Sequence, residues 1–350
     1  MKSLKPGEIK KLLFVRLRFI GDVIISTSVI KDLRSKYPEL HLAYLAEKMP
    51  LKMLENNPDI NELLEAEKGN VFTFIKMILK IRRKRYDAVL DVFGNPRSAL
   101  LTLFSGAKYR IGWNIRGRSF CYNTLITRKD VVDPAVKIDC IGAYEEAVEV
   151  LGVEKHKRLT KLHLSESELK AGETFKIKYS LTEPSRIIGI QPGCRRGDSL
   201  TWPKEKYAEL ADRLIAAGYK VLLFGGPADK ETNASVLKMM RSKPILAETS
   251  GIREDLALIN ICACFVTNNH GPVHMAVALK VPAVGLYRPD EIFTWFPYKD
   301  PIFKVLAEPE NYAGSNTTTV NTAKLETNIA VEKVFNSVLQ LLKIAQGETK

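Results

Sequence analysis

The sequence lacks any apolar stretch long enough to cross a lipid bilayer. Hydrophobic residues make up 45% of its 350 positions, yet no run reaches the roughly 18 residues that a membrane-spanning helix needs. The basic start of the chain leads into a short strand-like segment without a small-residue cleavage site, so we recognise no export signal. We therefore expect a cytoplasmic protein with enough apolar residues to form packed cores.

Cysteine is also scarce. The spacing of the five cysteines fits neither a zinc site nor a redox motif; they are Cys121, Cys140, Cys194, Cys262 and Cys264. This pattern excludes a disulfide scaffold and predicts reduced thiols. The loop after the first predicted strand contains neither Gly-x-Gly-x-x-Gly nor Gly-x-x-x-x-Gly-Lys-Ser/Thr, which excludes a dinucleotide fingerprint and a P-loop there.

Charge is distributed unevenly along the chain, whose net charge is +13. Residues 1–161 contain 30 basic and 19 acidic residues, a net +11, whereas residues 162–350 contain 23 and 21, a net +2. A basic half favours an anionic partner: a nucleic acid, an anionic membrane surface or a phosphorylated substrate. Solubility alone is the simpler explanation, and charge by itself does not exclude it.

Strand-like and helix-like segments alternate almost throughout, which predicts an α/β protein with parallel sheets. In the first half we expect strands at residues 11–17, 41–46 and 86–92, and helices at 22–37, 71–85 and 139–151. In the second half we expect strands at 187–191, 220–224, 265–267 and 283–286, and helices at 204–217, 229–240, 253–262 and 270–279. The later part of residues 156–185 is interpreted as a linker. The predicted domains are 1–165 and 186–321, two similar halves facing a central cleft, followed by a C-terminal helix within 322–350.

Asp22 follows the first predicted strand and a short loop that contains Gly21. Ligands of open α/β sheets gather at the carboxyl ends of strands, so a carboxylate here can accept a proton from a substrate hydroxyl. Aspartate is equally a favoured residue at the N-terminal cap of a helix. From spacing alone, the capping role is the better supported of the two.

Two loops of the second half combine glycine with charged residues between a strand and a helix. Residues 191–203 contain Gly193, Arg195 and Arg196, which suit a diphosphate but also fit a solvated charge cluster. Residues 224–231 place Asp229 after two glycines. There it either caps the following helix or binds the hydroxyls of a ribose or a sugar.

A third loop, residues 266–279, starts a helix of small residues near His270, where backbone N–H groups attract phosphate oxygens. His270 and His274 are four residues apart, which invites a zinc interpretation. Because no cysteine or carboxylate ligand is close in sequence, we expect contacts with a ligand or a buried histidine instead of a metal.

Residues 71–85 mix large apolar residues, among them Phe72, Phe74, Ile75, Ile78 and Leu79, with six basic ones and resemble a basic amphipathic surface helix. A core-packed helix with one solvated face is the commoner structure for such a segment. The amphipathic interpretation predicts peripheral, salt-sensitive contact with the inner face of the cytoplasmic membrane.

Taken together and in this order, the segments resemble the ADP-heptose:lipopolysaccharide heptosyltransferases, glycosyltransferase family 9. The resemblance covers roughly residues 11–298. It depends on four motifs: Arg16-Leu-Arg-Phe-Ile-Gly-Asp-Val23, Trp202-Pro-Lys-Glu-Lys-Tyr-Ala-Glu-Leu210, Gly225-Gly-Pro-Ala-Asp229 and Gly271-Pro-Val-His-Met-Ala-Val-Ala-Leu279. Each motif alone is weak, whereas four in the family's order are specific.

The resemblance implies a GT-B fold of two Rossmann-like domains, and an inverting, metal-independent transfer that needs no cofactor. The implied donor is a nucleotide-diphosphate sugar such as ADP-heptose, and the acceptor is an anionic lipid-linked glycan, the lipopolysaccharide core. Asp22 takes the position of the general base, with the acceptor near Arg18 and Gly21. Donor positions fall on Gly193, Cys194, Asp229, Asn269, His270, Gly271 and His274, and Arg195 and Arg196 are expected to bind the donor diphosphate in place of a lysine that the family usually has at residue 200.

Two departures from the family pattern keep a second function open. Leu200 stands where the family usually has a lysine, and Asn269 stands where it has an aspartate. The alternative is therefore a degenerate member that binds a nucleotide sugar or glycan without catalysis. No recognisable nucleic-acid module accompanies the positive charge, so we expect no nucleic-acid partner.

Overall fold

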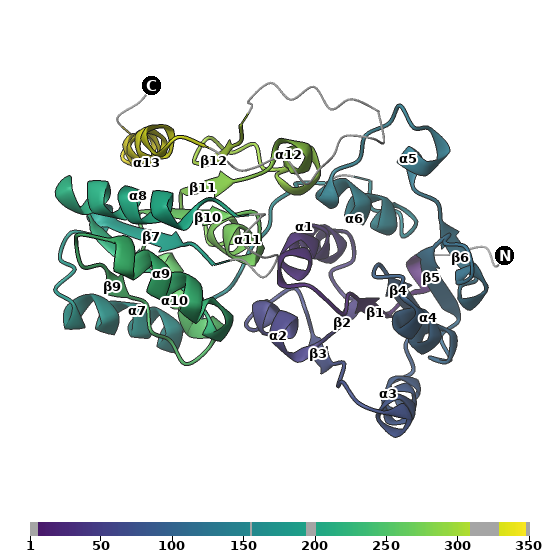
Figure 1. Ribbon diagram of the computed structural model, residues 1–350. Coiled ribbons are helices and arrows are strands. Elements are labelled where there is room, and N and C mark those ends of the chain that lie inside the picture. The colour runs from purple at the N-terminus through teal and green to yellow at the C-terminus, as the bar shows by residue number, and fades with distance from the viewer. Residues whose placement is uncertain (1–5, 155, 194–200, 309–328, 348–350) are drawn as a thin grey trace. The chain divides into compact units, whose positions relative to one another are not determined.

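The computed structural model describes residues 6–154, 156–193, 201–308 and 329–347. The chain divides into two compact units, residues 1–163 and 164–350. Each unit contains a sheet of six parallel strands with helices against its faces (Figure 1). The predicted α/β class with parallel sheets is therefore confirmed.

The first unit is built around the sheet order β3-β2-β1-β4-β5-β6. Its strands are β1 Lys11–Val15, β2 His41–Ala46, β3 Glu62–Glu65, β4 Ala88–Asp91, β5 Tyr109–Trp113 and β6 Thr124–Ile126. Its helices are α1 Ile20–Lys36, α2 Lys48–Leu51, α3 Val71–Arg83, α4 Pro96–Leu103, α5 Lys129–Val132 and α6 Cys140–Glu149. The direction in which successive strands are added reverses between β1 and β4, which makes this point the expected ligand site of the sheet.

The second unit repeats this arrangement with the order β12-β11-β10-β7-β8-β9. Its strands are β7 Ile187–Gln191, β8 Lys220–Leu223, β9 Ile245–Leu246, β10 Cys264–Asn268, β11 Ala283–Leu286 and β12 Phe303–Leu306. Its helices are α7 Glu166–Lys178, α8 Lys204–Ala216, α9 Lys230–Met239, α10 Ile252–Asn260, α11 Gly271–Ala278, α12 Ile292–Trp295 and α13 Val331–Ala345. When the strands are numbered within each unit, both sheets have the strand order of a Rossmann fold. In the second unit, the direction in which successive strands are added reverses between β7 and β10.

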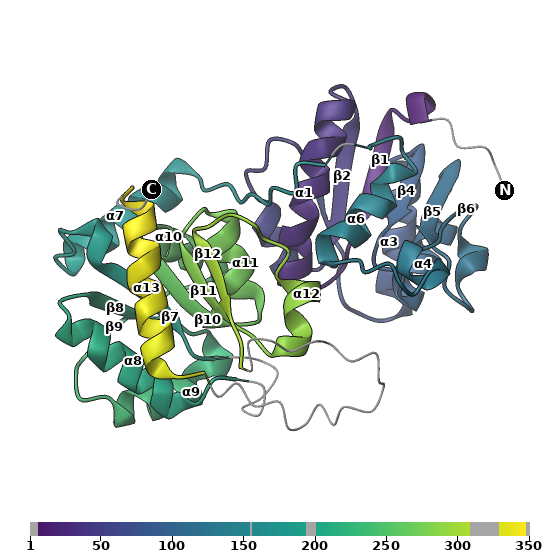
Figure 2. The same ribbon diagram turned by 90° about the horizontal axis from the view of Figure 1, so that it is seen from above.

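The central strand of the first sheet is apolar on both faces because helices cover both sides. Leu12, Leu13 and Phe14 of β1 are fully buried, as expected for a strand inside a parallel sheet. Figures 1 and 2 show α1 and α6 on one face of this sheet and α3 on the other. Met77 and Ile81 of α3 join the same apolar cluster as Leu13.

The C-terminal helix belongs to the core of the second unit. Val334, Val338 and Leu341 of α13 pack in one cluster with Ile188 and Ile190 of β7. Figure 2 shows α13 running along the sheet beside α8. The helix begins at Val331, so Ile329 and Ala330, expected within it, precede it. Residues 322–328, expected as its first turns, lie outside the described residues.

The later part of residues 156–185, interpreted as a linker, instead carries helix α7 of the second unit. The guanidinium of Arg253 in α10 binds both carboxylate oxygens of Glu168, with N–O distances of 2.6 Å. Gly172 lets the two helices approach closely, since a Cβ there would lie 3.1 Å from the carbonyl oxygen of Ala257. The sequence pattern missed this helix because charged residues dominate it.

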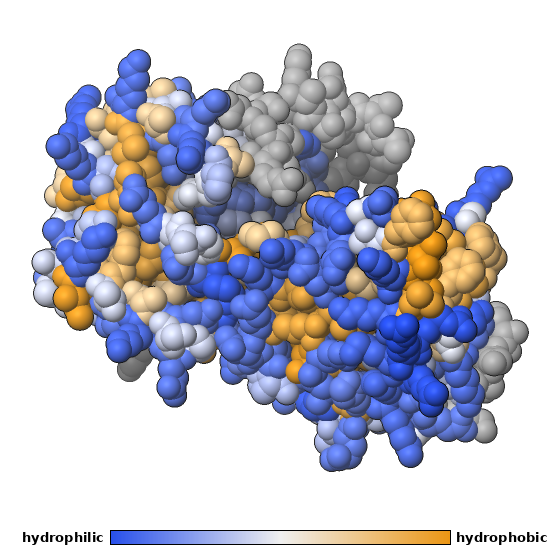
Figure 3. All heavy atoms as spheres, turned by 90° about the horizontal axis from the view of Figure 1, so that it is seen from below, coloured by the Kyte–Doolittle hydropathy of each residue, from blue (hydrophilic) through white to orange (hydrophobic). Residues whose placement is uncertain are grey.

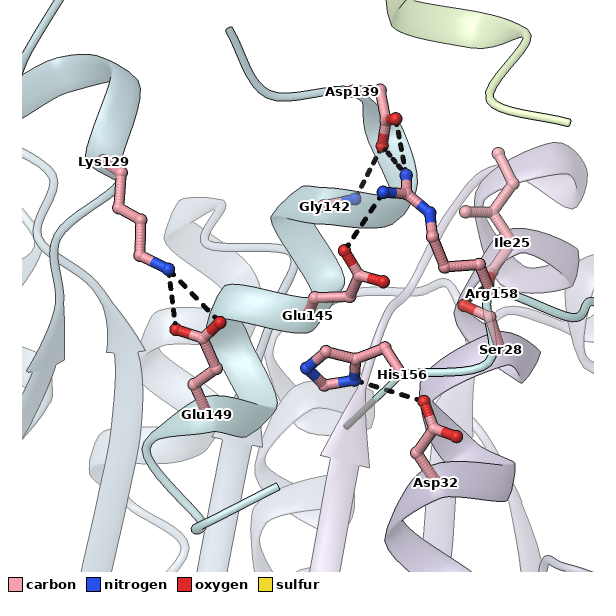
Figure 4. Close-up of polar contacts among 10 residues, drawn as sticks. All are labelled: Ile25, Ser28, Asp32, Lys129, Asp139, Gly142, Glu145, Glu149, His156 and Arg158. Atoms are coloured by element: carbon pink, nitrogen blue, oxygen red, sulfur yellow. Dashed lines mark hydrogen bonds and ion pairs between the residues drawn. The ribbon is translucent and has the colours of Figure 1, made fainter. Parts of the chain in front are cut away.

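The last segment of the first unit is fastened to α1 and α6 by charged side chains (Figure 4). Arg158 forms ion pairs with Asp139, the N-terminal cap of α6, and with Glu145 on the same helix. His156 Nδ1 lies 3.2 Å from the Asp32 carboxylate of α1. These contacts hold the chain against the first unit until shortly before α7 begins.

We predict that Gly189→Ala destabilises the second unit. A Cβ at residue 189 of β7 would lie 2.5 Å from the ring carbon Cδ2 of Phe265 in β10. Overpacking of this kind costs about 1–3 kcal/mol of unfolding free energy. Denaturant unfolding followed by circular dichroism measures it. Gly251→Ala is the matched control, because its Cβ would meet nothing within 4 Å. Equal midpoints for the two variants would contradict the packing described for β7.

Candidate active site

In the first unit, the strand reversal places a buried ion pair beside the end of β1. Arg16 directly follows the strand, and its guanidinium is paired with the carboxylate of Asp22 in the first turn of α1. Each side chain is only 14% exposed. The carboxylate therefore lies at the strand end where the topology predicts a ligand, with a cation already in place beside it.

Burial raises the pKa of the Asp22 carboxyl, and the neighbouring Arg16 opposes this rise. Helix α1 begins at Ile20, and its N-terminal cap residue is Phe19. Asp22 is thus the third residue of the helix and not its cap residue. A carboxylate with a raised pKa, held by one cation at a strand end, has the properties that a general base requires.

Aromatic side chains surround the Arg16–Asp22 pair. The Arg16 guanidinium lies 4.7 Å from the ring centroid of Phe93, in the loop after β4. Tyr44 of β2 and Tyr144 of α6 are buried nearby, close enough for their hydroxyls to affect the Arg16 pKa. Sequence reasoning did not select these residues, because their roles depend on which strands and helices are neighbours.

A fully buried carboxylate shapes the loop that contains Phe93. Asp91, the last residue of β4, accepts hydrogen bonds from the backbone N–H groups of Phe93 at 3.0 Å and Gly94 at 2.9 Å. The Tyr122 hydroxyl donates a third at 2.8 Å. Because Gly94 has a φ of +65°, the loop makes a tight turn that other residues rarely adopt. Asp91 therefore positions the aromatic ring against which Arg16 rests.

The two residues expected near the acceptor also lie beside β1. Gly21 belongs to the first turn of α1, next to Asp22. Arg18 is nearly half exposed, and its Nε lies 2.5 Å from Oε1 of Glu47. Lys68 approaches the other oxygen of that carboxylate at 2.9 Å. Arg18 and Lys68 thus form a basic rim on the first unit.

In the second unit, the ends of β7 and β8 bring Gly193 against Asp229. A Cβ at residue 193 would lie 2.2 Å from the Asp229 carboxylate oxygen Oδ1, so only glycine fits there. The other oxygen, Oδ2, accepts the backbone N–H of Gly226 at 2.8 Å. Asp229 therefore closes the glycine turn with one oxygen, while its second oxygen faces Gly193.

The end of β10 is tied to the neighbouring loop by Asn268, which is 1% exposed. Its Oδ1 accepts the backbone N–H of Trp202 at 3.0 Å, and its Nδ2 donates to the Pro192 carbonyl at 2.9 Å. Pro192 and Trp202 flank the loop whose glycine and arginines were assigned to the donor. Asn268 thus fixes both described ends of that loop, a role that no motif spacing indicated.

Asn269, which stands where the family pattern has an aspartate, is paired with a carboxylate. Its Nδ2 donates a hydrogen bond of 2.9 Å to Oε2 of Glu291, in the segment after β11. A carboxylate is therefore present at this strand end despite the substitution. Glu291 was not expected as a site residue, because it is far from Asn269 in sequence.

The two histidines of this region do not face one another. His270 is the N-terminal cap residue of α11, and its Nε2 lies 2.9 Å from Oγ1 of Thr267. His274 lies inside α11 with its Nδ1 2.7 Å from the Tyr298 hydroxyl. Burial lowers the pKa of His274 to about 4, so the imidazole is neutral near pH 7. Gly271, the first residue of α11, lies beside His270 at the helix N-terminus.

Three assigned donor residues, Cys194, Arg195 and Arg196, lie outside the described residues, as does Leu200. Within the described ranges, no cluster of three or more histidine, cysteine, aspartate or glutamate side chains is arranged to hold a metal ion. Among the helices of the same ranges, none has the length and apolar composition to span a membrane.

We predict that Asn268→Ala destabilises the second unit by about 2–6 kcal/mol. The change leaves the Trp202 N–H and the Pro192 carbonyl buried without their partner, and each lost partner costs about 1–3 kcal/mol. Denaturant unfolding measures the loss. Asn260→Ala, at an exposed position of α10, is the matched control and should stay near wild type. An Asn268→Ala variant as stable as this control would contradict the tethering role.

Comparison with known proteins agrees with this architecture. The family model described as "Glycosyltransferase family 9 (heptosyltransferase)" matches residues 74–324. Lipopolysaccharide heptosyltransferase 2 of Salmonella typhimurium is 30% identical over 291 residues, which cover 80% of this chain and 83% of that protein.

Two solved structures resemble the whole chain. The family 9 glycosyltransferase from Veillonella parvula superposes with a TM-score of 0.84 at 25% identity, covering 97% of this chain and 99% of that one. The E. coli ADP-heptose lipopolysaccharide heptosyltransferase II gives a TM-score of 0.77 at 25% identity, covering 97% and 100%. The expected GT-B fold class is confirmed by these neighbours. The chain therefore belongs to glycosyltransferase family 9, the heptosyltransferases, and is a glycosyltransferase.

Proposed function

We propose that this enzyme transfers a heptose from ADP-heptose to the lipopolysaccharide core, with inversion at the anomeric carbon and without a metal or cofactor. The relative from Salmonella typhimurium is a lipopolysaccharide heptosyltransferase, and the E. coli structure is of an ADP-heptose-dependent one. Both matches extend over most of this chain. A cytoplasmic location, with peripheral contact at the inner membrane face, fits an acceptor anchored in lipid.

The observation that carries the proposal is the Asp22 carboxylate beside Arg16 at the end of β1. A family member that had lost catalysis would have no need for a carboxylate whose pKa is raised by burial. The structure retains this group together with the cation and aromatic ring that orient it. This retention favours an enzyme over a binding protein.

In the proposed reaction, ionised Asp22 accepts the proton of an acceptor hydroxyl. That oxygen forms a bond to the anomeric carbon of the heptose, while the bond from this carbon to the diphosphate breaks. Attack on the face opposite the leaving group inverts the configuration. Arg16 orients the carboxylate for proton transfer and keeps it ionised near neutral pH.

The second unit is proposed to hold the donor. The departing diphosphate carries negative charge, which backbone N–H groups at the α11 N-terminus, around His270 and Gly271, can stabilise. Arg195 and Arg196 supply positive charge in place of the family's lysine. The amide of Asn269 and the carboxylate of Glu291, hydrogen-bonded to each other, are suited to bind sugar hydroxyls.

Asp22→Asn is expected to lower kcat by about 10²–10⁴-fold, the usual range for loss of a general base. ADP release from ADP-heptose in the presence of acceptor measures it. The affinity for ADP should remain near wild type, since the substitution lies outside the donor unit, whereas the thermal midpoint should fall because Arg16 is left buried without its counter-charge. Turnover within a few-fold of wild type would contradict the assignment of the base.

The pH dependence of kcat/KM gives an independent test of Asp22 as the general base. The base acts only when ionised, so kcat/KM is maximal above the pKa of Asp22 and falls as the pH drops through it. Because burial raises this pKa, the fall should occur above the ordinary aspartate range near 4. Arg16→Gln removes a charge that lowers the pKa, so it should move the fall to still higher pH.

We predict that Glu291→Gln raises the KM for the donor sugar by about tenfold, the loss expected for one hydrogen bond to a charged group. Inhibition by ADP alone should change little, because the carboxylate is assigned to the sugar. Asp290→Asn is the control on the neighbouring residue, whose carboxylate is paired with Arg288. Equal effects on ADP and on ADP-heptose would contradict a contact with the sugar.

A further inference from the structure

Helix α3 of the first unit has apolar residues on the side away from the core. Met77 and Ile81 pack into the unit and are almost fully buried. Val71 and Phe72 are 70% and 73% exposed, and Ile75 and Leu79 are nearly half exposed. Because Val71, Ile75 and Leu79 are spaced four residues apart, they form one stripe along the helix, next to Phe72.

Basic side chains border this stripe. Lys76, Lys80 and Arg83 are exposed on α3, and they line, with Leu79 and Lys84, an open surface hollow. No aspartate or glutamate occurs from residue 68 to residue 86. Figure 3 views the molecule from the side where α3 lies in Figure 1 and shows orange apolar side chains next to deep blue ones on this part of the surface.

The basic side chains on and next to α3 differ in whether they contact other residues of the first unit. Lys84 is paired with Glu62, and Arg82 donates to the carbonyl of Phe104 at 3.3 Å. Among the described residues, no ion-pair partner is found for Lys76, Lys80 or Arg83. We define the outer face of α3 by the side chains that are both exposed and uncommitted: Val71, Phe72, Ile75, Lys76, Leu79, Lys80 and Arg83.

We propose that the outer face of α3 docks onto an anionic lipid membrane. A lipid surface presents apolar chains beneath a layer of negative phosphate groups, and this face presents an apolar stripe bordered by positive charge. The helix is anchored to the core by Met77 and Ile81, so it presents the stripe as a preformed surface. Asn70 caps the helix by accepting the N–H groups of Phe72 and Thr73, which fixes the backbone of the first turn that carries Phe72.

We infer a lipid bilayer, and not a nucleic acid or an acidic protein, as the partner of this face. A bilayer can contact both the apolar stripe and the basic side chains that border it. A nucleic acid would neutralise the lysines and leave Phe72 and the aliphatic stripe in water. The sequence pattern left open whether the large apolar residues of this helix enter the core or reach lipid. Phe74 and Ile78 pack against the core cluster, whereas Phe72, Ile75 and Leu79 do not.

Vesicle sedimentation with the full-length protein tests the proposal, using anionic vesicles of phosphatidylglycerol and phosphatidylcholine and neutral vesicles of phosphatidylcholine alone. Wild type should bind the anionic vesicles at low salt and dissociate as salt rises. The triple variant Lys76→Gln, Lys80→Gln, Arg83→Gln should weaken binding up to about 100-fold, since each basic residue near the surface contributes about fivefold. The double variant Phe72→Ser, Leu79→Ser should weaken it by about tenfold or more.

Matched controls carry the same substitutions elsewhere on the surface. Lys170→Gln, Lys178→Gln and Lys238→Gln together remove three charges from α7 and α9, and Ile177→Ser removes an 80% exposed apolar residue. These variants should bind like wild type. The proposal is overturned if wild-type protein stays in the supernatant or binds neutral vesicles as well as anionic ones. It is also overturned if the control variants lose as much binding as the α3 variants. Self-association through α3 without vesicle binding also overturns it.

The membrane test is independent of catalysis, although its biological purpose rests on the proposed lipid-linked acceptor. If the protein proves inactive, vesicle binding still supports or overturns the role of α3. If it is active, the α3 variants should keep wild-type turnover on a delipidated acceptor and lose turnover on acceptor embedded in vesicles. An equal loss on both acceptors would assign the helix to stability instead of docking.

Discussion

The direction of parallel strands is the constraint on which both halves of this molecule depend. All strands of a parallel sheet end at the same edge, and the loops that follow them separate where the strand order reverses. In the first unit this reversal lies between β1 and β4, and it brings together Arg16, Asp22 and Phe93. In the second unit it lies between β7 and β10, and it brings Pro192 against Asn268.

The burial of Asp22, the proposed general base, also makes the first unit dependent on Arg16. Removing one member of a buried ion pair typically costs about 3–5 kcal/mol, because the other charge is left without compensation. The Arg16 guanidinium of this pair also lies against the ring of Phe93, whose loop is held by Asp91. The stability of the first unit and the proposed proton transfer thus depend on the same few contacts. In the second unit, the proposed sugar-binding site has a comparable pairing in Asn269 and Glu291.

The sequence predicted the elements with strong patterns and missed those whose formation depends on tertiary context. The apolar strands β2, β7 and β11 occur at their predicted residues. In contrast, β3 has acidic residues at both ends and β9 has only two residues, so neither shows a strand pattern. Helix α7 was missed because its attachment is the ion pair between Glu168 and Arg253, which are distant in sequence.

The residues of the candidate site likewise include some that the sequence predicted and some that only the tertiary structure reveals. Motif order was sufficient to identify the family and to select Asp22, Asp229 and Asn269. It could not identify Phe93, Asn268 or Glu291, because each acts through a partner brought near only by the sheet. The alternative role of Asp22 as the helix cap residue looked better supported until the start of α1 at Ile20 was known.

The most direct test of the central claim is a donor screen with the purified protein. ADP-heptose and other ADP-, GDP- and UDP-sugars are supplied with a lipopolysaccharide core acceptor, and both sugar transfer and donor binding are measured. We predict transfer from ADP-heptose, with the other donors far slower, and a product of inverted anomeric configuration. Binding of a nucleotide sugar without transfer from any donor would contradict it and would identify a family member that binds without catalysis.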